Sequence, residues 1–173
     1  YALKADRTLW AWGWNTSGQL GDGASTRRLA PVQITALADV IGVAAGATHA
    51  LAVKADGTAW AWGANASGQL GDGTTSGRTS PVQVSGLTNV VAVAAGASHS
   101  LALKSDGTVW AWGLNSSGAV GDGTGASHAA ATAVPALSGV EFIAAGDNFS
   151  AAIESGGSGR GQLWTWGSNT AGQ

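Results

Sequence analysis

Hydrophobic and polar residues alternate in short runs along the chain. Residues 80–87 (SPVQVSGL), 98–104 (SHSLALK) and 108–113 (TVWAWG) alternate, and residues 89–96 (NVVAVAAG) are apolar and small. Such runs are typical of β-strands, because successive residues of a strand point to opposite faces of a sheet. The pattern therefore predicts units of four short strands.

The same pattern recurs at intervals of roughly 50 residues, a period typical of solenoids, propellers and arrays. Trp10, Trp60 and Trp110 occupy equivalent positions, and Trp164 follows an insertion at 155–162 that lengthens one hairpin. We predict an all-β fold, a β-propeller segment of four-stranded antiparallel blades with about three and a half repeats.

The repeat divides the chain into four expected blades within one propeller domain. Their expected bounds are 1–39 (a partial blade with strands two to four), 40–88, 89–138 and 139–173 (a partial fourth blade). Repeat arrays need neighbours that cover their terminal faces. An isolated segment should therefore expose Trp10 and Trp12, or their alanine-side counterparts, at its open ends.

Paired tryptophans mark the third strand of every unit. Residues i and i+2 of a strand share a face, so Trp60 and Trp62 should lie on one face and Ala59 and Ala61 on the other. In a stack of sheets the indoles of one sheet would pack on the alanine side of the next, because close packing alternates large and small groups. We assign a structural role to eight tryptophans: Trp10, Trp12, Trp60, Trp62, Trp110, Trp112, Trp164 and Trp166.

One hairpin differs between the copies. Asp-Gly pairs at 56–57 and 106–107 join the second and third strands, where a type I′ turn requires positive φ. Arg7 takes the place of the glycine in the first copy. A side chain there should cost on the order of 1 kcal/mol or change the turn type.

Two segments carry a resemblance to a known family. VAAGATHALAV (43–53) and VAAGASHSLAL (93–103) resemble the signature of the regulator of chromosome condensation repeat family, and WAWGxNxSGxxGDG resembles its bacterial members. Phe149 stands in place of the histidine in the third copy. The resemblance implies a seven-bladed propeller, about twice the length of this chain. The chain thus looks like a segment of a longer propeller, with self-association of two segments as the second possibility.

Composition and charge restrict the partners. Only 10% of the residues are charged, the formal net charge is −2, and the basic residues are scattered. Without a basic stripe, nucleic acid is not expected as a partner. No apolar run approaches the roughly 18 residues of a membrane span. The chain has no cysteine, which fits an extracellular or periplasmic protein.

The repeated histidines and aspartates are interpreted as structural. His49 and His99 occur once per blade, so each imidazole is expected to bond nearby backbone, whereas a metal would need three or four converging ligands. Asp22, Asp72 and Asp122, in GDG, suit turns better than calcium binding. We expect no metal and no cofactor. No Ser-His-Asp set stands out, so we do not predict an enzyme.

Residues that depart from the repeat are the candidates for partner binding. Trp14 directly follows a strand, where the other copies have Ala, Leu or Ser, and Trp and Arg are enriched in binding hot spots. The family resemblance implies partner contacts for the loop that holds Asp147 and Asn148. His128, in a variable loop, is expected to be exposed. The candidate partner-binding residues are Trp14, Arg27, Arg28, Arg78, Asp147 and Asn148.

These observations favour a non-enzymatic propeller scaffold that binds a protein partner through variable blade loops. One alternative is a structural extracellular or surface component in which the blades act as spacers. A second alternative, taken from the family resemblance, is a protein similar to its β-lactamase inhibitors. The clustered tryptophans of the family's plant UV-B photoreceptor are absent, since the equivalent loops are GATHA and GASHS.

Overall fold

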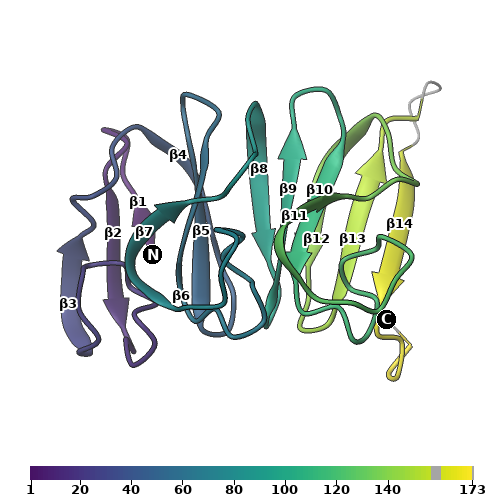
Figure 1. Cartoon of the computed structure of the whole chain (residues 1–173). Helices are drawn as coiled ribbons and strands as arrows, with labels where there is room; N and C mark the ends of the chain where they lie inside the picture. Colours follow the sequence, from purple (N-terminus) through teal and green to yellow (C-terminus); the bar gives the residue numbers. More distant parts are fainter. Residues whose placement is uncertain (157–160, 173) are drawn as a thin grey trace.

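The computed structural model describes residues 1–156 and 161–172, which form four antiparallel sheets side by side (Figure 1). Part of the predicted insertion, residues 157–160, lies outside the described residues. Two of the sheets have four strands each: β4 (Val40–Ala45), β5 (His49–Lys54), β6 (Ala59–Gly63) and β7 (Arg78–Gln83) in one, and β8 (Val90–Ala95), β9 (His99–Lys104), β10 (Val109–Gly113) and β11 (His128–Ala133) in the other.

The first and last sheets have three strands each. They consist of β1 (Ala2–Leu3), β2 (Leu9–Gly13) and β3 (Arg28–Gln33), and of β12 (Val140–Ala145), β13 (Phe149–Glu154) and β14 (Gln162–Gly167). Within every sheet the strands pair in sequence order. The predicted all-β class and the three and a half repeats are confirmed.

The first strands of the units lie next to one another. β4 packs against β8, and β8 packs against β12. Their last residues, among them Ala45, Ala95 and Ala145, line a shallow depression with the turns that follow. Small side chains suit this place because the sheets converge there.

Each tryptophan pair after the first packs on the preceding sheet. Trp62 is fully buried against Leu9 and Ala11 of the first sheet. Trp112 is buried in the same way against Ala59 and Ala61. Its indole N–H, like those of the equivalent tryptophans, donates to a loop carbonyl of the preceding unit, here that of Gln69 at 2.9 Å. Large indoles therefore face small alanines across each sheet boundary, which satisfies both packing and the buried N–H.

The other tryptophan of each pair is half-buried near the hairpin. In the first three units a lysine ammonium lies 5.5–5.8 Å from the ring centroid, as Lys54 does over Trp60. The last unit differs, because Trp164 donates its indole N–H to the Glu154 carboxylate at 2.8 Å. These positions combine an apolar contact with a polar or cationic partner at the edge of the core.

The repeated histidines bond a side chain of the next sheet, where the sequence predicted nearby backbone. Nε2 of His49 lies 2.9 Å from Oγ of Ser100, and His99 contacts Ser150 at the same distance. The prediction of a backbone partner was therefore wrong. The sequence distance of 51 residues hid this pairing, which exists only because consecutive units stack.

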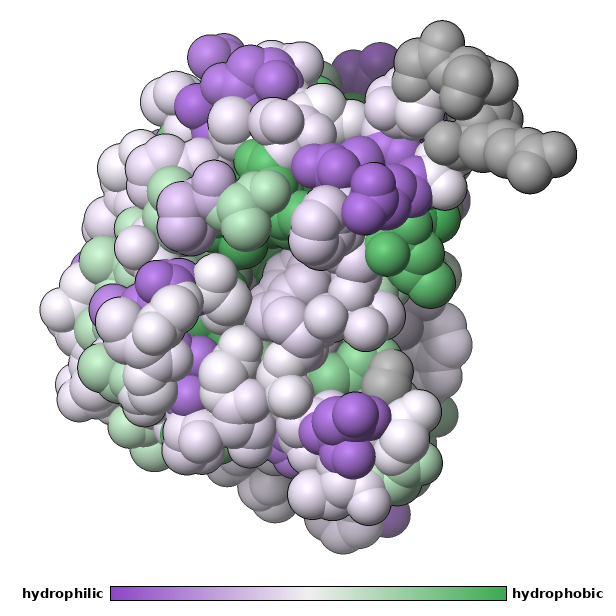
Figure 2. Space-filling view, turned by 90° about the vertical axis from the view of Figure 1, so that its right-hand side faces the viewer, coloured by the Kyte–Doolittle hydropathy of each residue, from purple (hydrophilic) through white to green (hydrophobic). Residues whose placement is uncertain are grey.

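Apolar side chains are exposed at both ends of the stack. Trp12 and Leu29 are exposed in the first sheet, and Phe142, Ile153 and Leu163 are exposed in the last one. Figure 2 views the end with the last sheet and shows hydrophobic atoms there between polar ones. Within residues 1–156 and 161–172, no further sheet covers these faces.

No helix within residues 1–156 and 161–172 is long and apolar enough to cross a membrane.

Candidate partner-binding surface

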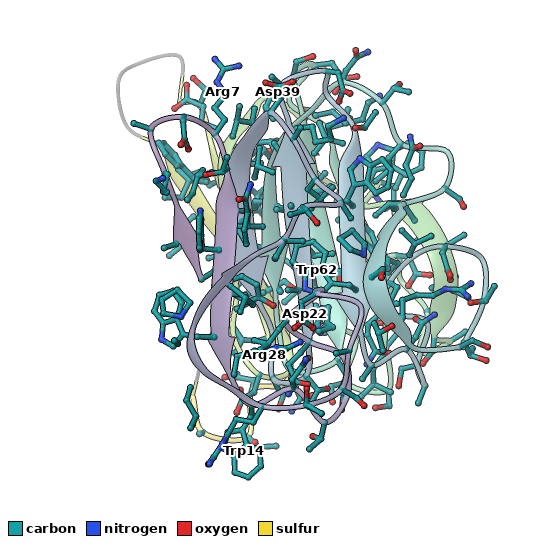
Figure 3. All side chains as sticks on the ribbon, turned by 90° about the vertical axis from the view of Figure 1, so that its left-hand side faces the viewer. Arg7, Trp14, Asp22, Arg28, Asp39 and Trp62 are labelled. Atoms are coloured by element: carbon teal, nitrogen blue, oxygen red, sulfur yellow. The ribbon has the colours of Figure 1, made fainter. Side chains whose placement is uncertain are left out.

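One end of the sheets carries the variable loops. We call it the loop face, which consists of the turns 46–48, 96–98 and 146–148 and of the loops 14–27, 64–77 and 114–127. Turn and loop are joined in the second, third and fourth units, as where the amide of Ala64 donates to the carbonyl of Thr48 at 2.9 Å. Figure 3 shows Trp14 at this end and Arg7 and Asp39 at the opposite one.

The structure places four of the six candidate residues on the loop face and the other two, Arg28 and Arg78, directly beside it. Two belong to the first loop, two begin the outer strands of the first and second sheets, and two lie in the last turn: Trp14 and Arg27, Arg28 and Arg78, Asp147 and Asn148. They are therefore on one side of the molecule but spread from the first sheet to the last.

A buried asparagine organises each long loop. Oδ1 of Asn15 accepts the amide of Leu20 at 2.9 Å, and its Nδ2 donates to Oδ1 of Asp22 at 3.0 Å and to the carbonyl of Ala24 at 3.1 Å. Asn65 and Asn115 make the equivalent bonds. All three asparagines are buried, so the folded chain does not offer their Asn-x-Ser/Thr sequences for glycosylation.

An ion pair closes each of the first two long loops onto the outer strand. Nε of Arg28 lies 2.5 Å from Oδ2 of Asp22, and Arg78 pairs with Asp72 at 2.7 Å (Figure 3 labels the first pair). Burial raises the pKa of Asp22, but hydrogen bonds from Arg28, from the backbone and from Asn15 outweigh it, and the pKa is lowered. Arg28 and Arg78 thus hold the loops from which they were expected to reach a partner.

His128 takes the place of the arginine in the third unit. Its Nε2 lies 2.7 Å from Oδ2 of Asp122, and the imidazole is half-buried. The expected exposure of His128 was therefore wrong. Burial opposes ionisation of Asp122, but hydrogen bonds from Thr124, His128 and Asn115 lower its pKa to about 2.

Trp14 and Arg27 form a pair on the surface. Trp14 follows the last residue of β2, Gly13, and is 68% exposed. The guanidinium carbon of Arg27 lies 5.6 Å from the Trp14 ring centroid. The stacked pair joins a large apolar surface to a positive charge, a combination suited to recognition of a protein surface.

Asp147 and Asn148 lie at the far end of the loop face. The carbonyl of Asp147 accepts the amide of Ala97 at 3.0 Å, and the carbonyl of Asn148 accepts that of Ser168 at 2.8 Å. Both side chains are exposed. Asp147 contributes the charged group of the shallow depression beside the first strands.

The described residues contain no group of three or more His, Asp or Glu side chains that could hold a metal ion.

Sequence comparison assigns the repeats. The model described as "Regulator of chromosome condensation (RCC1) repeat" matches residues 6–53, 56–103 and 106–153, and a second model of the same description matches residues 40–69, 90–119 and 140–173. The chain belongs to the RCC1 repeat family. No curated protein sequence matches the chain.

Solved structures of RCC1 proteins share the fold. Human WBSCR16 superposes with a TM-score of 0.83 and 27% identity over 96% of this chain and 44% of its own. Yeast RCC1 (Prp20), solved bound to Kap60, gives 0.78 and 26% over 94% of this chain and 40% of its own. Prp20p from Saccharomyces cerevisiae superposes with a TM-score of 0.75 and 26% identity over 87% of this chain and 40% of its own. The chain spans less than half the length of these proteins, and its four sheets are blades of an RCC1-type propeller.

Two groups of residues in these RCC1 repeats escaped the sequence analysis. The asparagines of the long loops, and Ser100 and Ser150, were given no role there. Their recurrence at equivalent positions was the available signal for the asparagines. The signal was weaker for the serines, because Ala50 stands at the equivalent position of the second unit.

Proposed function

We propose that this chain is a non-enzymatic scaffold that binds a protein partner through its loop face, with Trp14 and Arg27 as the anchor. The observation that carries the proposal is the 68% exposure of an indole stacked by a guanidinium. Exposed aromatic and arginine side chains supply much of the binding energy at protein interfaces. Trp10 and the six tryptophans of β6, β10 and β14 are buried or half-buried, whereas Trp14 projects into solvent.

The neighbouring arginines have different tasks. Arg28 is held by Asp22, whereas Arg27 makes no ion pair among the described residues. Its guanidinium therefore keeps donors for a carboxylate of the partner, which would accept in a bidentate geometry. We infer an acidic side chain beside an apolar patch as the partner's contact.

The buried Ser-His pairs support a non-enzymatic role. His49 and Ser100 have the 2.9 Å contact that a nucleophile and a base use, but both are buried. The Ser100 hydroxyl also donates to the carbonyl of Gln69 at 2.7 Å. A substrate would have no path to this oxygen, whose proton already has an acceptor.

The relatives also support a protein partner. One yeast RCC1 structure was obtained with Kap60 bound, and the other was described with its binding properties to Gsp1p and histones. About a quarter of the aligned residues are identical between these yeast proteins and this chain. We therefore infer from them only that the partner is a protein, and not which protein it is.

Peptide selection tests the anchor directly. A phage-displayed random peptide library is panned on the immobilised chain, and the selected peptides are titrated against Trp14→Ala and Arg27→Ala. We expect each substitution to weaken binding at least about tenfold, as for a hot spot worth more than about 1.4 kcal/mol. Selected sequences should contain Asp or Glu next to apolar residues.

Leu114→Ala is the matched control, because Leu114 occupies the position of Trp14 in the third unit. It should leave binding unchanged. Since Ala64 stands at this position in the second unit, Trp14→Ala should also leave the fold intact. Peptides that bind Trp14→Ala as well as the unchanged chain would contradict the proposal.

A further inference from the structure

The outer strand of the third sheet, β11, has a free edge. β11 is the last strand of its four-stranded sheet, and no strand among residues 1–156 and 161–172 pairs with its second edge. This edge lies on the side of the sheet opposite to β8, away from the two ends of the stack. We propose that β11 takes up an extended segment of a partner protein as a fifth strand, and that one side chain of this segment fills a hollow beside Trp110.

The second half of β11 offers backbone groups for such a strand. Thr132 pairs with Ala111 of β10, and the amide of Val134 donates to the carbonyl of Val109 at 2.9 Å. Successive residues of a strand direct their backbone groups to opposite sides, so the N–H and C=O groups of residues 131 and 133 point away from β10. A free edge of this kind is a template for pairing with another chain.

The outer strands of the first two sheets carry a proline where β11 has Ala131. Pro31 of β3 and Pro81 of β7 occupy the equivalent position. Proline has no N–H, and it is one of the residues by which proteins protect a sheet edge from pairing. Of these three outer strands, β11 alone keeps the amide that an added strand needs at this position.

A hollow of about 330 Å³ lies beside the end of this edge, and its apolar lining includes Trp110, Pro135 and Leu137. Its two charged lining residues, Lys104 and Asp106, pair with each other at 3.2 Å. All the lining residues belong to the third unit, and Trp110 packs on the core of the second sheet. Such a mostly apolar hollow with few polar groups suits one side chain of a bound segment.

The indole N–H of Trp110 lacks the partner that its equivalents have. Trp10 donates to the hydroxyl of Thr8 at 3.1 Å, and Trp60 donates to that of Thr58 at 3.0 Å. The indole N–H of Trp110 has no acceptor in the described part of the chain, where the ring contacts the ammonium of Lys104 instead. Indole N–H groups usually find an acceptor when they are covered, so a segment that covers the hollow should supply one.

The residue opposite Trp110 indicates what that segment supplies. Gln33 and Gln83 lie opposite the equivalent tryptophans of the first two sheets, whereas Ala133 lies opposite Trp110. Directly opposite side chains of paired strands contact each other, so the small Ala133 leaves room beside the indole. A glutamine of the partner fits this room, because its stem is apolar and its carbonyl oxygen accepts the indole N–H.

Peptide selection on a chain without the loop-face anchor tests this site separately. The bait is the double variant Trp14→Ala with Arg27→Ala, and the probe is a phage-displayed library of random peptides. The selected peptides are titrated against the bait and against the bait with Ala131→Pro or Ala133→Gln added. Each added substitution should weaken binding at least about tenfold, because the first removes an edge N–H and the second fills the hollow. Selected sequences should contain glutamine within an extended, β-branched stretch.

Thr132→Val is the matched control. Val32 and Val82 stand at this position in the first two units, and Thr132 pairs inward with Ala111, so the free edge is unchanged. The variant should bind the selected peptides like the bait. Ala131→Pro and Ala133→Gln likewise copy residues of the first two units, so the fold should accept them.

Amide exchange followed by NMR on the unchanged chain is the second measurement. The amides of Ala131 and Ala133 and the indole N–H of Trp110 should exchange rapidly in the free chain and become protected at saturating peptide. The amide of Thr132 should be protected in both states, because it already faces β10.

Three results would overturn the proposal. They are a library that yields no binder of the double variant, selected peptides that bind either added substitution as tightly as the bait, and saturating peptide that leaves the amides of Ala131 and Ala133 unprotected. If a variant fails to fold by circular dichroism, amide exchange on the unchanged chain decides alone. None of these results bears on the anchor formed by Trp14 and Arg27, because the bait lacks it.

Discussion

Nε2 of His49 lies 2.9 Å from Oγ of Ser100, across the boundary between the second and third sheets. The Ser100 hydroxyl donates its proton to the carbonyl of Gln69, so it accepts the N–H of the imidazole. His49 thereby carries a proton on Nε2, and its buried Nδ1 has no partner among the described residues. His99, Ser150 and the carbonyl of Ala119 repeat this relay.

The first boundary is built differently. Ala50 stands where Ser100 and Ser150 do, and the hydroxyl of Tyr1 donates to the carbonyl of Gln19 instead. Burial is the main reason that the pKa of Tyr1 rises to about 12. At every boundary, a side-chain hydroxyl thus donates a hydrogen bond to the loop carbonyl, although the hydroxyl comes from a tyrosine at the first boundary and from a serine at the other two.

The buried histidines should make stability depend on pH. Burial lowers the pKa of His49 and of His99 to about 4, with repulsion from His99 adding to the effect at His49. The unfolded chain binds protons near pH 6.5 and the folded one does not, so stability is complete above that pH and falls towards pH 4. The loss should be about 3 kcal/mol per histidine, measured by denaturant titration across this range.

A double substitution isolates this effect. His49→Phe with His99→Phe copies Phe149, the residue at the equivalent position of the last sheet. The variant should unfold at a denaturant midpoint that changes little between pH 6.5 and 4. If the stability of this variant still fell with pH as steeply as that of the unchanged chain, groups other than the two histidines would be responsible for the acid sensitivity.

Loss of a loop asparagine should destabilise the fold. Asn65→Ala leaves the amide of Leu70 and two loop carbonyls without their partner. We expect a loss of about 2 to 4 kcal/mol in the free energy of unfolding, because the Leu70 amide is buried and the two carbonyls are part-buried. Asn169→Ala is the control, since this equivalent residue is exposed, and it should cost little.

Gly71 should not accept a side chain. A Cβ at Gly71 would lie 2.7 Å from Nε1 of Trp112, whereas one at Gly86 would meet nothing within 4 Å. Both glycines have similar positive φ, 70° and 73°, so backbone strain is the same in the two alanine variants. Gly86→Ala should cost about 1 kcal/mol and Gly71→Ala clearly more, with a change in tryptophan fluorescence. Equal melting temperatures for the two variants would contradict this prediction, because they would show that the Trp112 indole moves aside at little energetic cost.

Arg7 adopts the same turn conformation as the glycine of the other hairpins. Its φ is 64°, and its amide donates to Lys4 at 2.9 Å as that of Gly57 does to Lys54, so the turn is kept and the residue is strained. Arg7→Gly should therefore stabilise the chain by about 1 kcal/mol in denaturant titration. Arg7→Ala keeps the strain and should give no such gain; an equal gain from alanine would trace the effect to the lost side chain.

The repeat, the strands and the two faces of each sheet were readable from the sequence. Alternation in TVWAWG places Trp110 and Trp112 on one face whatever their neighbours are, because the period of a strand is a local property. The exposed apolar ends followed from the same reasoning, since a stack of sheets has two faces without a neighbour.

The partners of the polar side chains were decided only by the tertiary structure. Arg28 and Trp14 were equal candidates in sequence, but folding ties Arg28 to Asp22 and leaves Trp14 in solvent beside Arg27. His49 finds Ser100 only when two sheets meet. Hydrophobic period is set by neighbours along the chain, whereas a hydrogen bond depends on distances of a few ångströms between segments that the sequence keeps far apart.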